Sequence, residues 1–222
     1  MPPWLRWAGD LPATVVFDLG NVLITWDPHP AIAAAVGPDR ARAFLTGDFG
    51  FAAWNHAQDA GRSWDDGEAA ALETHPHLAD EIRAYRQHFD LSMVGPVEGS
   101  VTILRTLAAH GVRLLALTNW SAELFPRAVE RFDFLSLFEH ITVSGRISLA
   151  KPDPEVFHRL AADAPVDLLG TVFVDDSPAN VEAASSVGMD AITFTTPGQL
   201  ARELALRGLP VPTPAELGEP RT

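Results

Sequence analysis

The sequence predicts an α/β protein: a parallel sheet with helices on both faces, and a helical segment inserted after the first strand. Two observations support this class. From about residue 98 onward, short apolar runs alternate with segments of helical spacing, which is the order of parallel strands joined by helices. Between 27 and 92 the chain instead carries alanine-rich and amphipathic stretches without the pattern of a buried strand.

The elements follow in order along the chain. A first strand is expected at 14–17, and helical stretches follow it at 31–36, 40–45, 67–72 and 78–89. A helix is expected over 97–110, because apolar residues recur at three- and four-residue spacing and Gly111 suits a left-handed C-cap. The remaining elements are strands at 112–117, 140–143, 171–174 and 191–194, and helices at 122–132, 154–162 and 178–187.

The same pattern predicts the domain organisation. Residues 1–26 and 93–212 would form the core that contains the sheet, and residues 27–92 a helical cap with hinges near 26–29 and 93–96. The proline-rich residues 213–222 would form a flexible tail. A length of 222 residues suits one domain with a large insertion or two modest domains.

Composition excludes several classes of function. A net charge of −13 argues against a nucleic acid or an anionic membrane as partner, because both require basic patches. The absence of cysteine excludes disulfides, thiolate metal sites and a cysteine nucleophile. With no signal-peptide core and no stretch of membrane-spanning length, a cytoplasmic location is expected. The oligomeric state is not indicated by the sequence.

Three apolar runs end on polar groups that can do chemistry. These groups are Asp18 after 15–17, Thr118 and Asn119 after 114–117, and Asp175 and Asp176 after 172–174. The only lysine among sixteen basic residues, Lys151, lies in the segment Leu-Ala-Lys-Pro-Asp-Pro at 149–154. Ligands of open α/β proteins bind outside the carboxyl ends of parallel strands, so these groups should gather at one place. Together they are the inventory of a phosphoryl-transfer site.

Four motifs resemble those of the haloacid dehalogenase superfamily of hydrolases. In chain order they are FDLGNVL at 17–23, LTNW at 117–120, KPDPEVF at 151–157 and VDDSPAN at 174–180. Each motif is short, but four of them in the family's order form a strong signal. The resemblance spans roughly residues 13–195 and implies a Rossmann-like core, with the helical insertion in the place of the family's cap.

The resemblance also implies roles for the site residues. Asp18 would be the nucleophile that forms an aspartyl phosphate during hydrolysis. Thr118 and Asn119 would hold the transferring phosphoryl group through the hydroxyl and backbone amides. Lys151 would offset the negative charge of Asp18 and of the phosphoryl oxygens.

Magnesium is the expected cofactor. Adjacent carboxylates repel one another unless a cation lies between them, and oxygen ligands beside a phosphate suit Mg²⁺. In the family the second residue of the acidic pair usually ligates the metal, so Asp176 is the first choice. Asp18 and the main-chain carbonyl of Gly20 would complete the protein ligands, and Asp175 would support the site or pair with Lys151.

The chain departs from the family pattern at Gly20. Most phosphatases of the family carry a second aspartate there, which protonates the leaving oxygen and later activates water. Such proton transfer contributes about a hundred- to ten-thousandfold in rate. The start Phe-Asp-Leu-Gly-Asn-Val resembles bacterial sugar phosphatases that act on glucose 1-phosphate, whose anomeric hydroxyl is a better leaving group than a simple alcohol. A magnesium-dependent phosphatase acting on a small phosphorylated metabolite, expected to be a sugar phosphate, is therefore the first interpretation.

Two alternatives stay open. A 2-haloacid dehalogenase would attack carbon and release halide without a metal, but the pair Asp175 and Asp176 argues against it. A degenerate member that binds a phosphorylated ligand or a protein partner without turnover would explain Gly20. The intact set of Asp18, Lys151 and Asp176 argues against that alternative.

Substrate selection is expected from the insertion. Trp54 and His56 are predicted to bind substrate: a tryptophan ring can stack on a sugar, and histidine exchanges protons near neutral pH. Each residue also has a structural interpretation. A tryptophan on a helix face more often packs in a core, and a lone histidine more often lies on the surface.

Overall fold

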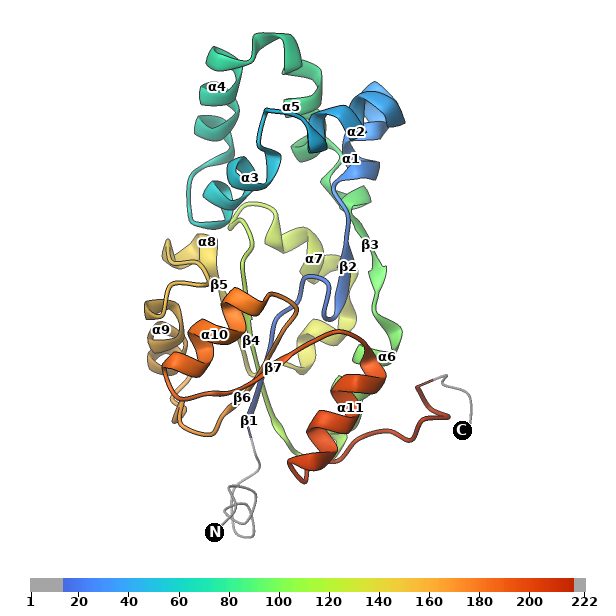
Figure 1. The fold of residues 1–222 in the computed structure, drawn as a ribbon, viewed down its shortest axis with the longest axis vertical. Coiled ribbons are helices and arrows are strands. Elements are labelled where there is room, and N and C mark those ends of the chain that lie inside the picture. Colours follow the sequence, from blue (N-terminus) through green and yellow to red (C-terminus); the bar gives the residue numbers. More distant parts are fainter. Residues whose placement is uncertain (1–13, 218–222) are drawn as a thin grey trace.

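The computed structural model describes residues 14–217. Its main sheet has five strands, all paired in parallel (Figure 1). In spatial order they are β5 (His140–Val143), β4 (Arg113–Thr118), β1 (Thr14–Phe17), β6 (Val172–Asp175) and β7 (Asp190–Thr193). Phe17 pairs with Ala116 on one side and Val174 on the other, so the carboxyl ends of the three central strands lie at the same edge of the sheet. The predicted α/β class is confirmed.

Helices cover both faces of the sheet. Val15 and Phe17 belong to one hydrophobic cluster, together with residues of α6 (Glu98–Ala109) and α11 (Pro197–Leu206). Val16 belongs to a second cluster, with residues of α9 (Glu155–Asp163) and α10 (Pro178–Ser186). Because both faces of each strand are buried, the strands are nearly continuous apolar runs.

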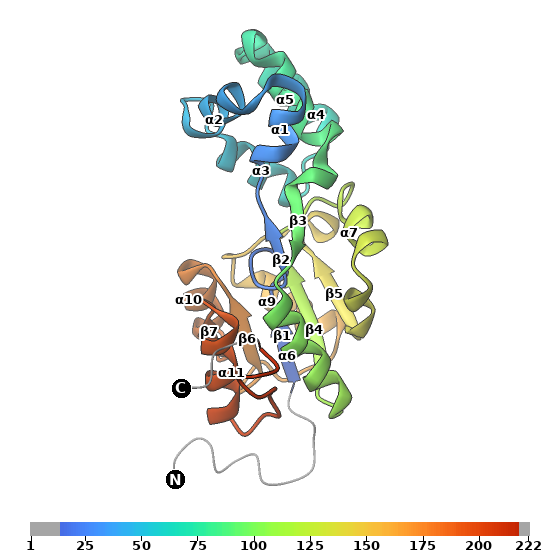
Figure 2. The same cartoon turned by 90° about the vertical axis from the view of Figure 1, so that its right-hand side faces the viewer.

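The inserted segment is helical. It contains α1 (His29–Val36), α2 (Pro38–Thr46), α3 (Phe51–Asp59), α4 (Trp64–Thr74), α5 (Ala79–Gln87) and the short 3₁₀ helices η2 (Pro76–Leu78) and η3 (Phe89–Ser92). An antiparallel pair, β2 (Ile24–Trp26) and β3 (Met93–Pro96), leads into and out of it. Figure 2 shows the helices stacked beyond one edge of the sheet, with β2 and β3 side by side between them and the core.

The structure adds elements that the sequence pattern did not indicate. The helix α11 begins after the last expected strand, where the Thr196 side chain accepts a hydrogen bond from the Gln199 backbone at 3.1 Å. Smaller additions are η4 (Asp133–Leu137) and α8 (Ser144–Ile147), whereas α7 (Phe125–Arg131) is the shorter form of the helix expected at 122–132. None of the helices within 14–217 is both long and apolar enough to cross a bilayer.

The expected tail at 213–222 lies only partly within the described residues. Glu216 accepts hydrogen bonds from the backbone and hydroxyl of Thr213, both at 2.7 Å, and Leu217 packs against the main hydrophobic cluster. Residues 218–222, like residues 1–13 of the predicted core, lie outside the described part. The division into core, cap and tail stays a prediction.

Candidate active site

The acidic residues of the motifs come together at the carboxyl edge of the sheet. The Asp18 backbone N–H donates to Val174 O at 2.8 Å, which ties the end of β1 to the end of β6. Asp18, Asp175 and Asp176 each offer a carboxylate oxygen, and these oxygens lie within 4.8 Å of one another. Three negative charges this close need a cation between or beside them.

Lys151 supplies one such cation. Its side chain is 1% exposed, and Nζ lies 2.8 Å from Asp18 Oδ1 and 2.7 Å from Asp175 Oδ2. The third ammonium hydrogen is donated to Leu117 O at 2.8 Å, so all three donors have acceptors. Burial lowers the pKa of Lys151, but Asp18 and Asp175 outweigh this and raise it above its ordinary value.

One ammonium does not balance three carboxylates. Burial is the main cause of the raised pKa of Asp18, which is about 7. The charge of Asp175 raises this pKa further, and Lys151 lowers it in part. Burial also raises the pKa of Asp176, with a further contribution from Asp175. Raised pKa values mean that the ionised carboxylates lack compensating positive charge. The three carboxylates of this cluster could therefore hold a second cation.

Asp175 differs from its two acidic neighbours because its oxygens already have partners. Oδ1 accepts from the Ser177 backbone at 2.8 Å and from Asn180 at 2.9 Å, while Oδ2 accepts from Lys151 at 2.7 Å and from Asn180 at 3.1 Å. The residue is fully buried, with no exposed surface. This geometry suits a residue that positions Lys151, and it leaves Asp18 and Asp176 as the carboxylates that face the pocket.

Thr118 and Asn119 occupy the end of β4. The Thr118 hydroxyl is fully buried and has no hydrogen-bond partner within the described residues, which is costly for a polar group unless a ligand supplies the partner. The Asn119 side chain donates to Lys151 O at 2.8 Å and accepts from Lys151 N at 2.9 Å. Asn119 thus fixes the Lys151 loop, a role that the sequence did not indicate.

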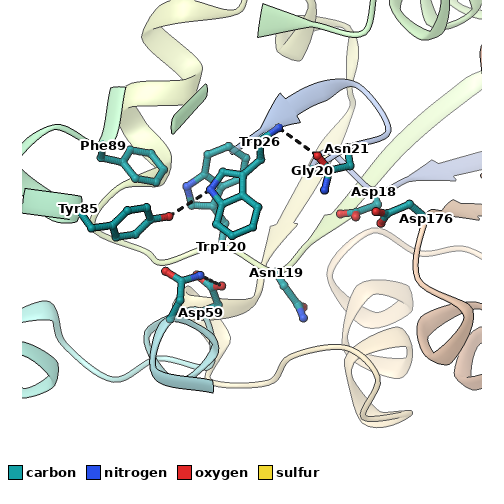
Figure 3. Close-up of a pocket in the computed structure, with 11 residues that line it drawn as sticks. Asp18, Gly20, Asn21, Trp26, Asp59, Tyr85, Phe89, Asn119, Trp120 and Asp176 are labelled. Atoms are coloured by element: carbon teal, nitrogen blue, oxygen red, sulfur yellow. Dashed lines mark hydrogen bonds between the residues drawn. The ribbon is translucent and has the colours of Figure 1, made fainter. Parts of the chain in front are cut away.

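A pocket of about 170 Å³ opens beside this cluster (Figure 3). Its wall contains Asp18, Gly20, Asn21, Trp26, Asn55, Asp59, Tyr85, Phe89, Asn119, Trp120 and Asp176. In Figure 3 the acidic residues Asp18 and Asp176 lie at one end and the aromatic rings at the other. The Trp26 indole donates to Tyr85 Oη at 3.2 Å, which joins the hinge strand β2 to the inserted helix α5.

Comparison with known proteins decides the family. The model of the haloacid dehalogenase-like hydrolases matches residues 12–188 of this chain. The chain belongs to this family. The resemblance drawn from the four motifs is confirmed at that level.

Named relatives agree with this family assignment, and a solved structure shares the fold. Flavin mononucleotide hydrolase 1 of Arabidopsis thaliana is 30% identical over 121 residues, which is 53% of this chain but only 48% of that relative, about half its length. A sesquiterpene phosphatase of Aspergillus oryzae is 28% identical over 205 residues, covering 87% of this chain and 94% of the relative. A haloacid dehalogenase family enzyme of Bacteroides thetaiotaomicron, solved with magnesium and inorganic phosphate, superposes with a TM-score of 0.65 at 19% identity, covering 83% and 94%. This last likeness shows the shared fold.

Two predicted substrate contacts of the hydrolase need correction. Trp54 is 9% exposed, packs among aromatic rings such as Phe51 and Trp64, and donates its indole N–H to Gly67 O at 2.9 Å. His56 lies on the exposed face of α3. Neither residue is among those that line the pocket. The helix presents a different face to the cavity from the one that the sequence suggested.

The residues of α3 that line the pocket are Asn55 and Asp59, one helical turn apart. The Asn55 side chain donates to Asp59 Oδ2 at 3.0 Å. Burial raises the pKa of Asp59 to about 7, and the backbone N–H of Ser121 lowers it in part. Sequence reasoning missed both residues, as well as Tyr85 from α5. The spacing of an amide and a carboxylate four residues apart was the available signal.

Proposed function

We propose that this hydrolase is a magnesium-dependent phosphatase that acts on a small phosphorylated metabolite, with a sugar phosphate as the expected class. The observation that carries the proposal is the set of groups around the Asp18 end of the pocket. A buried carboxylate stands beside a buried ammonium, and at the end of the neighbouring strand β4 the Thr118 hydroxyl is buried with no partner among residues 14–217. A phosphoryl group bound there would meet a nucleophile, a positive charge and a hydrogen-bond donor.

The donor set fits magnesium. Asp18, Asp176 and the carbonyl of Gly20 would hold the ion, and Asp175 would support them by orienting Lys151. The fit rests on the charge imbalance of the cluster, where three carboxylates share one ammonium. When bound, the ion would neutralise charge on the phosphoryl oxygens.

The protein's own groups account for the transfer. A carboxylate oxygen of Asp18 attacks phosphorus opposite the ester oxygen, so a bond from Asp18 to phosphorus forms while the ester bond breaks. The electron pair leaves with the alcohol oxygen, which takes up a proton from solvent water. Water then attacks the phosphorus of the aspartyl phosphate, which releases inorganic phosphate and restores the Asp18 carboxylate. Lys151 holds Asp18 in place throughout, and the Thr118 hydroxyl donates to a phosphoryl oxygen.

The glycine at position 20 shapes the expected substrate. With no carboxyl group at that position, the alcohol oxygen must leave with less help from a proton donor. An anomeric oxygen tolerates this better than a simple alkoxide does. The proposal therefore favours a sugar 1-phosphate, in line with the resemblance of the first motif to sugar phosphatases.

The test measures phosphate release from a panel of sugar phosphates with magnesium and with excess chelator, alongside halide release from 2-chloropropionate. We expect metal-dependent phosphate release, a loss of at least about a thousandfold in Asp18→Asn, and unchanged release in Asp39→Asn, whose side chain is 97% exposed. Halide release that survives the chelator would replace the proposal with dehalogenation. Wild-type phosphate release by Asp18→Asn would remove Asp18 as nucleophile.

A further inference from the structure

The charges on the pocket wall restrict what the alcohol part of the substrate can carry. The wall contains three carboxylates, Asp18, Asp59 and Asp176, and within the described residues it contains no arginine, lysine or histidine. Lys151, the nearest cation of the site, already donates to two carboxylates and a carbonyl. A second acidic group on the substrate would therefore be buried without a positive partner, which is strongly unfavourable.

Asp59 is the feature that this wall leaves unexplained. In Figure 3 it lies at the aromatic end of the pocket, across the cavity from Asp18 and Asp176, so it faces the part of a substrate remote from the phosphoryl group. Its contacts are neutral: the amide of Asn55 at 3.0 Å and the backbone of Ser121. No basic side chain pairs with Asp59 within residues 14–217. Burial without such a partner is the cause of its raised pKa, about 7.

The surrounding rings and the size of the cavity limit the substrate further. Trp26, Tyr85, Phe89 and Trp120 line the same end of the pocket as Asp59. Such rings suit the apolar face of a small ring compound, while a polar residue among them fixes its orientation. The volume of about 170 Å³ is below the roughly 300–1,000 Å³ of pockets for drug-sized ligands. One ring fits this space better than a long chain or a fused ring system.

We propose that Asp59 determines substrate specificity by accepting a hydrogen bond from a hydroxyl or ammonium group on the alcohol part of the ester. The inference rests on the proposed phosphatase function and names its substrate class: phosphate monoesters of small ring polyols and amino polyols without a second acidic group. A substrate with an ammonium group at this point should bind most strongly, because the group places a positive charge against a buried carboxylate. A carboxylate on the ring binds least well, because it brings a further acidic group against a wall that already contains three acidic side chains.

Three esters with the same ring and the same leaving oxygen provide the test: glucose 1-phosphate, glucosamine 1-phosphate and glucuronic acid 1-phosphate. For the wild-type protein we expect kcat/KM to fall in the order glucosamine, glucose, glucuronic acid, with at least about a hundredfold between the extremes. Asp59→Asn should lower kcat/KM for the glucosamine ester by about tenfold or more and raise it for the glucuronic acid ester. Asp39→Asn removes the same charge from the exposed surface of α2 and should keep the wild-type order.

A binding measurement separates this inference from the phosphatase proposal. Tryptophan fluorescence can follow the addition of glucosamine, glucose or glucuronate, none of which carries a phosphate. Phosphate release at equal kcat/KM from all three esters would overturn the role of Asp59 while the phosphatase proposal stands. If no ester is hydrolysed, the proposed function fails. Preferential binding of glucosamine over glucuronate that Asp59→Asn removes would then still support Asp59 as the recognition group, and equal binding by the wild type or an unchanged preference in Asp59→Asn would overturn it.

Discussion

Gly20 is a position where one side chain separates this hydrolase from the family pattern. Its backbone does not lie in the left-handed region that favours glycine, and a Cβ built there meets no other group within 4 Å. The glycine is therefore not required by the backbone or by close packing. It leaves the site without a carboxyl group at a position where the Cβ of a side chain has space.

A first prediction concerns Gly20→Asp. The variant should fold, and it should raise kcat for alkyl phosphates by at least about tenfold, because a new acid can protonate a poor leaving group. Aryl phosphates, which leave easily, should gain less. Rates for the two ester classes and a thermal melt check this. Gly20→Ala adds the Cβ without the acid, and an equal gain in that variant would show that proton transfer is not the cause.

Lys151 is held by charge at the centre of the site. A second prediction is that Lys151→Met lowers the free energy of unfolding by about 3–5 kcal/mol at pH 7, because it leaves Asp18 and Asp175 buried without their ammonium partner. The loss should shrink at acidic pH as Asp18, whose pKa burial raises to about 7, becomes protonated. Urea unfolding at several pH values measures it. A loss below about 1 kcal/mol at pH 7 would contradict the charge balance described here.

At the scale of elements, the inserted helices are docked onto the core segments that follow β4 and β5. Trp64 at the start of α4 donates its indole N–H to Ser121 Oγ at 2.7 Å and its backbone N–H to Glu123 at 2.8 Å. Gly61, in the turn before α4, has φ +105°, and a Cβ there would lie 2.5 Å from Ser148 Oγ. The turn between α3 and α4 therefore packs against the segment that leads to Lys151.

Two glycines make this docking testable, and this is the third prediction. Gly37→Ala introduces only backbone strain, because φ is +83° and ψ is 162°, a region that side chains other than glycine rarely adopt, and its Cβ would meet nothing within 4 Å. It should lower the free energy of unfolding by about 1–3 kcal/mol. Gly61→Ala introduces backbone strain and also displaces Ser148, so it should lower the free energy of unfolding by more than Gly37→Ala does. Its kcat should also fall, because the Lys151 loop shifts. Equal stability and equal kcat for the two variants would show that the turn does not press on the core.

At the scale of the whole molecule, negative charge dominates, with a net charge of −13 and an acidic cluster at the sheet edge. A fourth prediction is that Mg²⁺ raises the melting temperature by several degrees, because a ligand at a hundred times its Kd contributes about 2.7 kcal/mol. Asp176→Asn should abolish most of this shift. Thermal melts with magnesium, with chelator and with sodium at equal ionic strength measure it. An equal rise in the variant would point to general screening of charge.

The pH dependence of stability should also respond to one buried carboxylate. The pKa of Asp59 is raised from 3.8 to about 7, so the unfolded chain ionises before the folded protein does. The stabilisation that comes from the neutral Asp59 side chain is therefore complete below about pH 4, and it is lost as the pH rises through about 7. A fifth prediction is that Asp59→Asn matches the wild type near pH 4 and is more stable at pH 8, by at most about 4 kcal/mol. Equal stability at both pH values would refute the shift.

Several features could be predicted from the sequence alone. The end of a buried strand can be predicted from the local sequence, because an apolar run followed by a polar residue marks where the strand leaves the core. Asp18, Thr118 and Asp176 were found in this way, and parallel pairing brought their strands to one edge. The helical character of the insertion was equally local, since it follows from spacing along the chain.

Only the tertiary structure decided which residues of the insertion reach the site. Every helix has several faces, and the partner that it packs against determines which of them is buried. In α3 the face with Trp54 turned into the aromatic core, and the face with Asn55 and Asp59 turned to the pocket. Tyr85, distant in sequence, closed the same wall. Local pattern determined the chemistry at the sheet edge, whereas long-range packing determined the surface that a substrate meets.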